Sequence, residues 1–125
     1  MRRTVLIVED TELCRDTLEV ALMKLPNLAV QAVTTAEEAL EWLEANDVCA
    51  LVTDLHLPLM DGFELIEAVR QRPWRSSLPI LVISGDSDPR IPIRVAKLGA
   101  NAFFSKPYSP AEVRQTLEQL LGAGD

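Results

Sequence analysis

Hydrophobic residues along the chain are grouped into five short runs that have the character of β-strands. The first, Thr4–Glu9, is a continuous apolar run that ends in acids, as expected for a strand buried on both faces of a parallel sheet. The other four runs are Leu28–Val33, Ala50–Thr53, Ile80–Ser84 and Ala102–Ser105. Apolar residues after each run recur at three- and four-residue spacing, which is typical of amphipathic helices. The pattern therefore predicts five strands alternating with five helices.

The predicted helices carry start and stop signals. The apolar stripe expected on the first helix comprises Leu13, Leu18, Ala21, Leu22 and Leu25. The second and fifth helices each begin with a pattern typical of a capping box, Thr35-Ala-Glu-Glu38 and Ser109-Pro-Ala-Glu112. Asp61-Gly62 supplies turn and helix-start chemistry for the third helix. Arg94–Leu98 is expected to be a short fourth helix that Gly99 can end.

This alternation predicts an α/β fold with an open five-stranded parallel sheet and helices on both faces, because right-handed crossovers connect the strands. The flavodoxin-like (βα)5 arrangement with strand order 2-1-3-4-5 is one common solution, and periodicity alone does not choose that order. The length of 125 residues is typical of one domain. We expect residues 1–121 to form it and residues 122–125 to be a tail or the start of a linker.

Composition narrows the classes of partner. The 19 acidic and 12 basic residues give a net charge of −7, which opposes direct binding to nucleic acid and to anionic membranes. The hydrophobic content of 48% excludes a disordered chain. The first apolar run, Val5–Val8, is too short for a signal peptide or a membrane span. We therefore expect a cytoplasmic protein.

Polar residues at the ends of the predicted strands are the candidates for chemistry. Ligands of open α/β sheets bind outside the carboxyl ends of the strands. Glu9 and Asp10 follow the first strand, Asp54 follows the third, Ser84 ends the fourth, and Lys106 follows the fifth. If the fold is of this class, all five side chains face one crevice.

A cluster of carboxylates at that crevice favours a hard divalent cation. Three carboxylates a few ångströms apart repel one another by roughly 1–4 kcal/mol per pair, so a cation stabilises them. Oxygen ligands suit Mg²⁺, whereas zinc prefers thiolate or imidazole, and His56 is the one histidine in the chain. A metal-bound carboxylate facing a lysine can accept a phosphoryl group, and Asp54 is the central acid.

Four motifs follow one another along the chain: Val8-Glu9-Asp10, Asp54-Leu-His-Leu-Pro-Leu-Met-Asp-Gly62, Ser84-Gly85 and Phe103-Phe-Ser-Lys-Pro107. This ordered set resembles the response-regulator receiver domains of two-component signal transduction over essentially the whole chain. The resemblance implies that Asp54 is the phosphoacceptor and that Ser84 and Lys106 contact the phosphate. The implied Mg²⁺ ligands are Glu9, Asp10, Asp54 and the main-chain carbonyl of His56.

The same resemblance implies how the domain would be used. Its phosphoryl donor would be a histidine kinase or a phosphotransfer protein, and its output would be a contact with one downstream protein target. It would catalyse its own phosphorylation and dephosphorylation without turning over a separate substrate. Ser84 and Phe103 match the positions whose side chains change conformation when the domain is phosphorylated. The peptide bond before Pro107 is implied to be cis.

One departure concerns the fourth helix. Pro89 and Pro92 fall where members of the family begin this helix, and a proline past the first turn breaks a helix. We therefore expect the fourth helix to be short or displaced. His56, two residues after the phosphoacceptor, is expected at the mouth of the pocket, where its side chain can alter the lifetime of the phosphoryl group.

Three other functions fit parts of the pattern. A receiver-like protein-interaction module that works without phosphorylation would keep the same crevice. A phosphohydrolase of the haloacid-dehalogenase type needs a second acid two residues after the nucleophile, where His56 stands. A flavodoxin-type electron carrier needs a phosphate-binding loop rich in Ser, Thr and Gly after the first strand, where Asp10-Thr-Glu-Leu13 stands.

Overall fold

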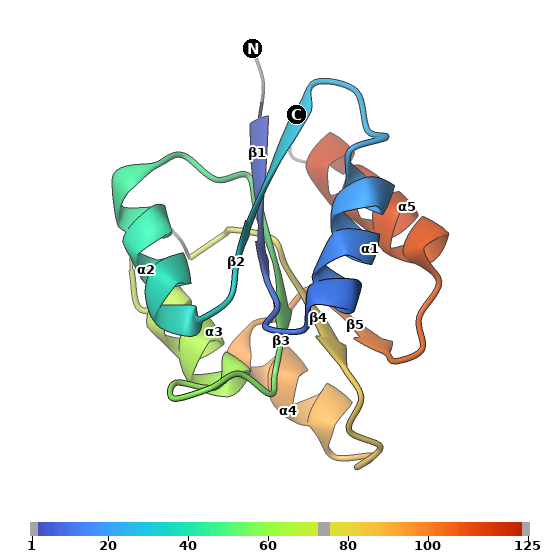
Figure 1. Ribbon diagram of the computed structural model, residues 1–125. Helices are drawn as coiled ribbons and strands as arrows, with labels where there is room; N and C mark the ends of the chain where they lie inside the picture. Colours follow the sequence, from blue (N-terminus) through green and yellow to red (C-terminus); the bar gives the residue numbers. More distant parts are fainter. Residues whose placement is uncertain (1–2, 73–75, 124–125) are drawn as a thin grey trace.

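All five predicted strands and all five predicted helices are found in the computed structural model, which describes residues 3–72 and 76–123. Figure 1 shows the elements in chain order. They are β1 (Arg3–Val8), α1 (Glu12–Leu22), β2 (Leu28–Val33), α2 (Ala36–Ala45), β3 (Ala50–Asp54), α3 (Gly62–Arg70), β4 (Ile80–Ser84), α4 (Ile91–Leu98), β5 (Ala102–Ser105) and α5 (Pro110–Ala123).

The strands form one parallel sheet in the order β2-β1-β3-β4-β5, which confirms the flavodoxin-like arrangement. The inner strands β3 and β4 are buried along their whole length, which explains their continuous apolar character. Val8 of β1 pairs with Thr53 of β3, and Asp54 of β3 pairs with Ile83 of β4. The carboxyl ends of these three strands therefore lie side by side.

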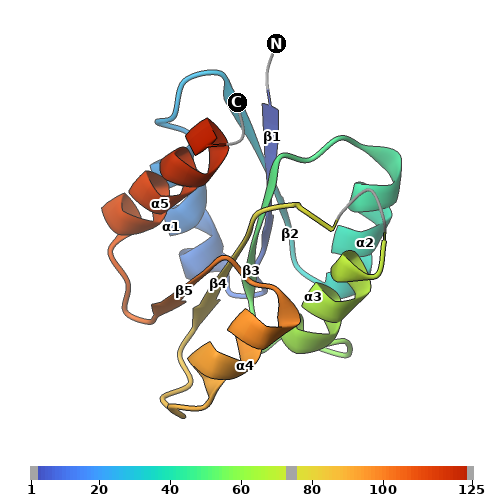
Figure 2. The same cartoon turned by 180° about the vertical axis from the view of Figure 1, so that it is seen from behind.

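Helices cover both faces of the sheet (Figures 1 and 2). Helices α1 and α5 pack on one face, where the core contains Val5, Ile7, Leu18, Leu81 and Leu117. Helices α2, α3 and α4 pack on the other, where the core contains Leu6, Leu43, Leu51, Leu65 and Val95. Alternate residues of each strand supply the two faces, and each buried leucine or isoleucine contributes about 1.5–3 kcal/mol to the hydrophobic term.

Side chains cap α2, α3 and α5 at the predicted starts, but the box predicted for α2 is half formed, because Glu38 Oε1 accepts from the Thr35 hydroxyl and not from its backbone N–H. Asp61 and Glu64 form a complete capping box at the start of α3. Thr35 accepts a hydrogen bond from the backbone N–H of Glu38 at the start of α2, and Ser109 accepts one from Glu112 near the start of α5. These local signals therefore place the first turns of three helices.

Two expectations about the helices are wrong. Leu13 does not belong to the buried stripe of α1: its side chain is 77% exposed, because five residues of helix turn it about 140° away from Leu18. Helix α4 begins at Ile91 and not at Arg94, because Pro92 lies in the first turn, where its missing N–H has no partner to lose. With eight residues, α4 is nevertheless short, as expected.

Helix α5 continues to Ala123, while residues 124–125 lie outside the described part of the chain, so the tail expected at 122–125 stays a prediction. Among the described residues no helix is long and apolar enough to cross a membrane. A cytoplasmic location also stays a prediction.

Candidate functional site

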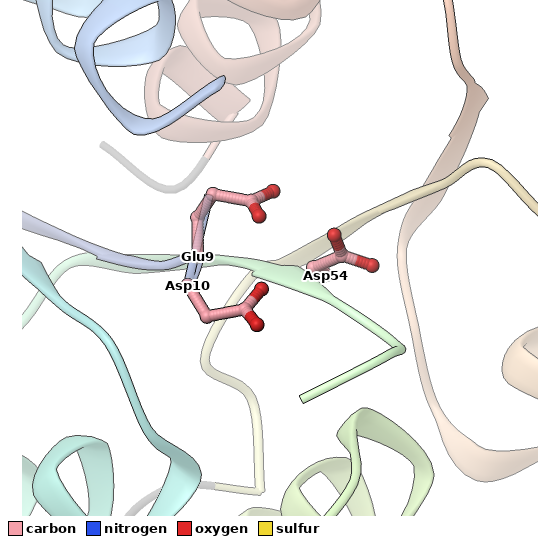
Figure 3. Close-up of side chains that lie close together, drawn as sticks. All are labelled: Glu9, Asp10 and Asp54. Atoms are coloured by element: carbon pink, nitrogen blue, oxygen red, sulfur yellow. The ribbon is translucent and has the colours of Figure 1, made fainter. Parts of the chain in front are cut away.

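Three carboxylates meet at the carboxyl ends of β1 and β3. Glu9 and Asp10 directly follow β1, and Asp54 is the last residue of β3, so the pairing of these neighbouring strands brings the acids together (Figure 3). Each acid offers an oxygen within 4.8 Å of the others. Glu9 and Asp54 are buried, whereas Asp10 is exposed. The cluster therefore opens to solvent on the side of Asp10.

Lys106 reaches this cluster from the loop after β5. Its Nζ lies 2.6 Å from Asp54 Oδ2 and 3.2 Å from Glu9 Oε2. The backbone N–H of Lys106 donates to the carbonyl of Ser84 at 2.8 Å, which extends the pairing of β4 and β5 by one residue. The peptide bond between Lys106 and Pro107 is cis, as the resemblance implied.

Main-chain donors hold the two buried acids in place. The N–H of His56 donates to Asp54 Oδ1 at 3.1 Å, and the N–H of Thr11 donates to Glu9 Oε1 at 3.0 Å. The loop after β3 returns close to the strand at Gly62, where an added Cβ would lie 2.4 Å from the carbonyl oxygen of Asp54. Only glycine permits that approach, because a Cβ at this distance overlaps the backbone.

Burial and hydrogen bonding set the charges of the site. Burial raises the pKa of Glu9, and the neighbouring Asp54 adds to this effect. Burial acts in the same direction on Asp54, but hydrogen bonds from Lys106 and from the main chain of His56 outweigh it and lower its pKa. Burial alone would lower the pKa of Lys106, yet its contacts with Asp54 and Glu9 raise it. Asp54 is therefore an ionised carboxylate beside an ammonium group.

The family profile of the response regulator receiver domain matches residues 5–118. The chain belongs to this family. The profile spans β1 to α5 and so includes every side chain of the site described above. The haloacid-dehalogenase and flavodoxin alternatives are therefore set aside.

Relatives of known name agree with this assignment. A chemotaxis protein CheY homolog of Campylobacter jejuni is 31% identical over 120 residues, which cover 95% of this chain and 92% of the relative. The two-component response regulator ORR13 of Oryza sativa is 34% identical and covers 93% of this chain and 96% of its own. The crystal structure of a putative response regulator from Chloroflexus aurantiacus superimposes with a TM-score of 0.90 at 33% identity, covering 98% of this chain and 99% of that one.

The other three predicted residues of the receiver domain lie in three different places. Ser84 is fully buried at the end of β4, and its Oγ accepts a hydrogen bond from the N–H of Asp86 at 3.1 Å. His56 is exposed, and its Nε2 lies 3.4 Å from Asp86 Oδ2. Phe103 is not in the crevice: it lies in β5 and packs against the core on the α4 side of the sheet.

Sequence reasoning missed three contributors to the site. The N–H of Thr11 holds the Glu9 carboxylate, and the Arg15 guanidinium donates to the Glu9 carbonyl at 3.1 Å. Thr11 is the N-cap of α1 and Arg15 is the fourth residue of this helix, so both lie close to the strand-end acids along the chain. Asp86 follows Ser84 by two residues, the same spacing that separates His56 from Asp54, and this symmetry was available in the sequence.

The donor set of the crevice fits a hard cation. Within the described part of the chain, the side chains grouped here as possible metal ligands are three carboxylates, two of which are buried, and Lys106 does not neutralise all three charges. The His56 ring is directed to Asp86, so it adds no imidazole to the cluster. Such a set suits Mg²⁺, which binds through a few carboxylates and keeps several waters.

Proposed function

We propose that this receiver domain is a phosphorylation-dependent signalling switch that accepts a phosphoryl group on Asp54 with Mg²⁺ as cofactor. The observation that carries the proposal is the 2.6 Å contact between Lys106 Nζ and Asp54 Oδ2 inside an all-oxygen cluster. Phosphoryl transfer depends on positioning and on neutralised charge more than on a strong base. A buried, ionised aspartate held by a lysine and a main-chain N–H meets both needs.

Each residue then has a distinct role. The Asp54 carboxylate is the nucleophile, Lys106 neutralises negative charge on the phosphoryl oxygens, and the Ser84 hydroxyl donates to one of them. The proposed Mg²⁺ ligands are Glu9, Asp10, Asp54 and the main-chain carbonyl of His56. When bound, the metal would supply further positive charge to offset the negative charge of the transferred group. The domain would catalyse only its own phosphorylation and dephosphorylation.

The proposed output is a shift between two conformations. Ser84 Oγ accepts from the N–H of Asp86, and this contact must change if the hydroxyl turns to a phosphoryl oxygen. Phe103 is half-buried in β5 and packs against the core, and its ring is the side chain that would move inward together with Ser84. The surface of α4, β5 and α5 would then differ between the two states, and a downstream protein would bind one of them.

The proposed donor is a histidine kinase or a phosphotransfer protein. Helix α1 exposes Leu13 and Val20, at 77% and 61%. Leu13 also lines a groove of about 440 Å³ that is bounded by Lys106, so this face is continuous with the phosphoacceptor site. The proposal includes no nucleic acid and no membrane partner.

The test is labelling of Asp54 by a small donor. The domain is incubated with acetyl phosphate or beryllofluoride, with and without Mg²⁺, beside the variant Asp54→Asn, and followed by mass spectrometry and NMR. We expect a Mg²⁺-dependent adduct that is absent from Asp54→Asn, with resonance shifts at Ser84 and Phe103. A folded wild-type domain that neither labels nor shifts would instead be a receiver-like interaction module that works without phosphorylation.

A further inference from the structure

A side chain from α2 holds the β3–α3 loop, residues 55–61. Glu37 lies in the first turn of α2, beside α3, and its Oε2 accepts a hydrogen bond from the backbone N–H of Met60 at 3.3 Å. The N–H groups of His56 and Asp61 bond instead to near neighbours in the chain, at the end of β3 and in the first turn of α3. Glu37 therefore attaches the middle of this loop to an element that is distant in sequence.

The second carboxylate oxygen of Glu37 is in an unfavourable position. This atom, Oε1, is buried, and among the residues that the structure describes it has no hydrogen-bond partner. An unpaired buried acceptor costs free energy, so such a group in a folded protein calls for an explanation. The bond from Met60 to Oε2 supplies one, because the carboxylate cannot leave this position without breaking the attachment of the loop.

The loop is strained directly beside this attachment. Leu59 has a φ of 64°, in the left-handed region that residues with a Cβ avoid. Its side chain is 89% exposed, so packing of that side chain does not hold the backbone in this conformation. Leu57 and Met60 pack into the core on either side of Leu59, and Glu37 adds the polar contact to the next N–H group. Glu37 therefore stabilises the strained part of the loop.

We propose that Glu37 is a positioning residue for the metal site: it holds the β3–α3 loop in the strained conformation that places the main-chain carbonyl of His56 for Mg²⁺ binding. This inference rests on the proposed Mg²⁺ site, in which that carbonyl is a ligand. A main-chain ligand has no rotatable side chain, so its position depends on the contacts of the loop that carries it. Glu37 contacts neither the metal nor Asp54 in this role and acts through Met60.

The test measures the dissociation constant of Mg²⁺ by NMR titration of the metal-free domain, without a phosphoryl donor. Glu37→Ala removes the acceptor, and we expect Mg²⁺ to bind about tenfold more weakly, the lower end of the effect of losing a residue that orients a metal ligand. Glu37→Gln removes the negative charge but keeps an oxygen that can accept from Met60, so its dissociation constant should stay within about twofold of wild type.

Glu38 is the matched control, because this adjacent acid bonds to Thr34 and Thr35 at the start of α2 and not to the loop. Glu38→Ala removes a negative charge from the same helical turn and should leave the dissociation constant of Mg²⁺ unchanged. A readout without metal is the hydrogen exchange of the Met60 amide, which should become faster in Glu37→Ala and stay at the wild-type rate in Glu38→Ala. Urea unfolding verifies that each variant is folded.

Leu59→Asn tests the role of the strained backbone. Asparagine adopts a positive φ more readily than leucine, and the exposed Leu59 side chain makes this replacement without loss of core packing. We therefore expect Leu59→Asn to restore most of the Mg²⁺ affinity that Glu37→Ala loses. The same replacement supplies a less strained background for the titration if Glu37→Ala alone does not fold. A double variant that folds and binds Mg²⁺ no more tightly than Glu37→Ala would contradict the proposal.

The outcomes separate this inference from the proposed function. A wild-type domain that binds no Mg²⁺ would overturn the proposed metal site and the role of Glu37 with it. A wild-type domain that binds Mg²⁺, with the same dissociation constant in Glu37→Ala, would overturn the role of Glu37 alone. Equal weakening in Glu37→Gln or in Glu38→Ala would trace the effect to the lost negative charge. Unchanged exchange of the Met60 amide in Glu37→Ala would show that the hydrogen bond does not hold the loop. Both of these results contradict the proposal.

Discussion

Lys106 shows how one residue organises the charges of this domain. It lies at the end of β5, which is not a neighbour of β1 or β3, yet its ammonium group contacts Glu9 and Asp54. Without that contact two buried carboxylates would face each other at low dielectric, where repulsion is strong. The lysine thus allows Asp54 to stay ionised although its side chain is only 6% exposed.

A second residue with a shifted titration is Tyr108, which lies two residues after Lys106. Burial, followed by the nearby Cys14 and Glu9, raises the pKa of Tyr108 to about 12. The unfolded chain therefore loses this proton near pH 10, before the folded domain does. The contribution of Tyr108 to the free energy of unfolding is therefore fully present below about pH 10 and is lost as the pH rises toward 12.

Tyr108 is the one tyrosine in the chain, so absorbance of the phenolate reports it alone. We expect a titration midpoint well above that of free tyrosine, and a free energy of unfolding in urea that falls between about pH 10 and pH 12. Tyr108→Phe should reduce that fall. A midpoint near 10 in the folded domain would contradict the prediction.

At the scale of elements, α3 and α4 are tied to the sheet by a polar network. The Arg70 guanidinium donates to the carbonyl of Gly99 at 2.7 Å and to Asn101 Oδ1 at 3.2 Å. Asn101 Oδ1 also accepts from the N–H of Ile80 at the start of β4. Gly99 ends α4 with a φ of 111°, and an added Cβ would lie 2.8 Å from Arg70 Nε. This network therefore links the end of α4 to α3 and to the start of β4.

The capping box of α3 can be tested by a pair of variants. Asp61→Ala removes the side chain that accepts from the N–H of Glu64, so it should lower the free energy of unfolding by about 1 kcal/mol. Thr11→Ala is the control, because within the described part of the chain the Thr11 hydroxyl makes no cap hydrogen bond to α1. Urea unfolding should show a smaller loss for Thr11→Ala than for Asp61→Ala. Equal losses would mean that the box does not stabilise α3.

At the scale of the whole molecule, the acidic cluster couples metal binding to folding. The three acids come together only in the folded domain, since Glu9 and Asp10 follow β1 and Asp54 ends β3, with a helix, a strand and a second helix between them in the chain. A cation that binds this cluster therefore binds the folded state and not the unfolded chain. Binding shifts the folding equilibrium by mass action.

We therefore expect Mg²⁺ to raise the thermal midpoint and EDTA to reverse the effect. At a Mg²⁺ concentration of one hundred times its dissociation constant, the free energy of unfolding should rise by about 2.7 kcal/mol. Asp10→Asn should weaken the effect, because it removes an exposed ligand without disturbing the contacts of Lys106. Sodium chloride at matched ionic strength is the control. An equal rise with sodium chloride would show general screening of the net charge of −7 and no specific site.

Local patterns in the sequence determined the elements and the candidate residues of this protein. The positions of the strands, the caps of α2, α3 and α5, and the acids, serine and lysine at the strand ends all depend on neighbours within a few residues. Periodicity and capping act over that range, so they can be recognised without tertiary structure. The family motifs also predicted roles for Asp54 and Lys106.

Only the tertiary structure decided how distant segments meet. It selected the strand order, placed Lys106 2.6 Å from Asp54 across 52 residues of chain, and paired His56 with Asp86. It also turned Leu13 outward. These features depend on which strands are neighbours and on how the helices are rotated against the sheet. Both are set by the packing of the two cores, a property of the whole chain that no local pattern contains.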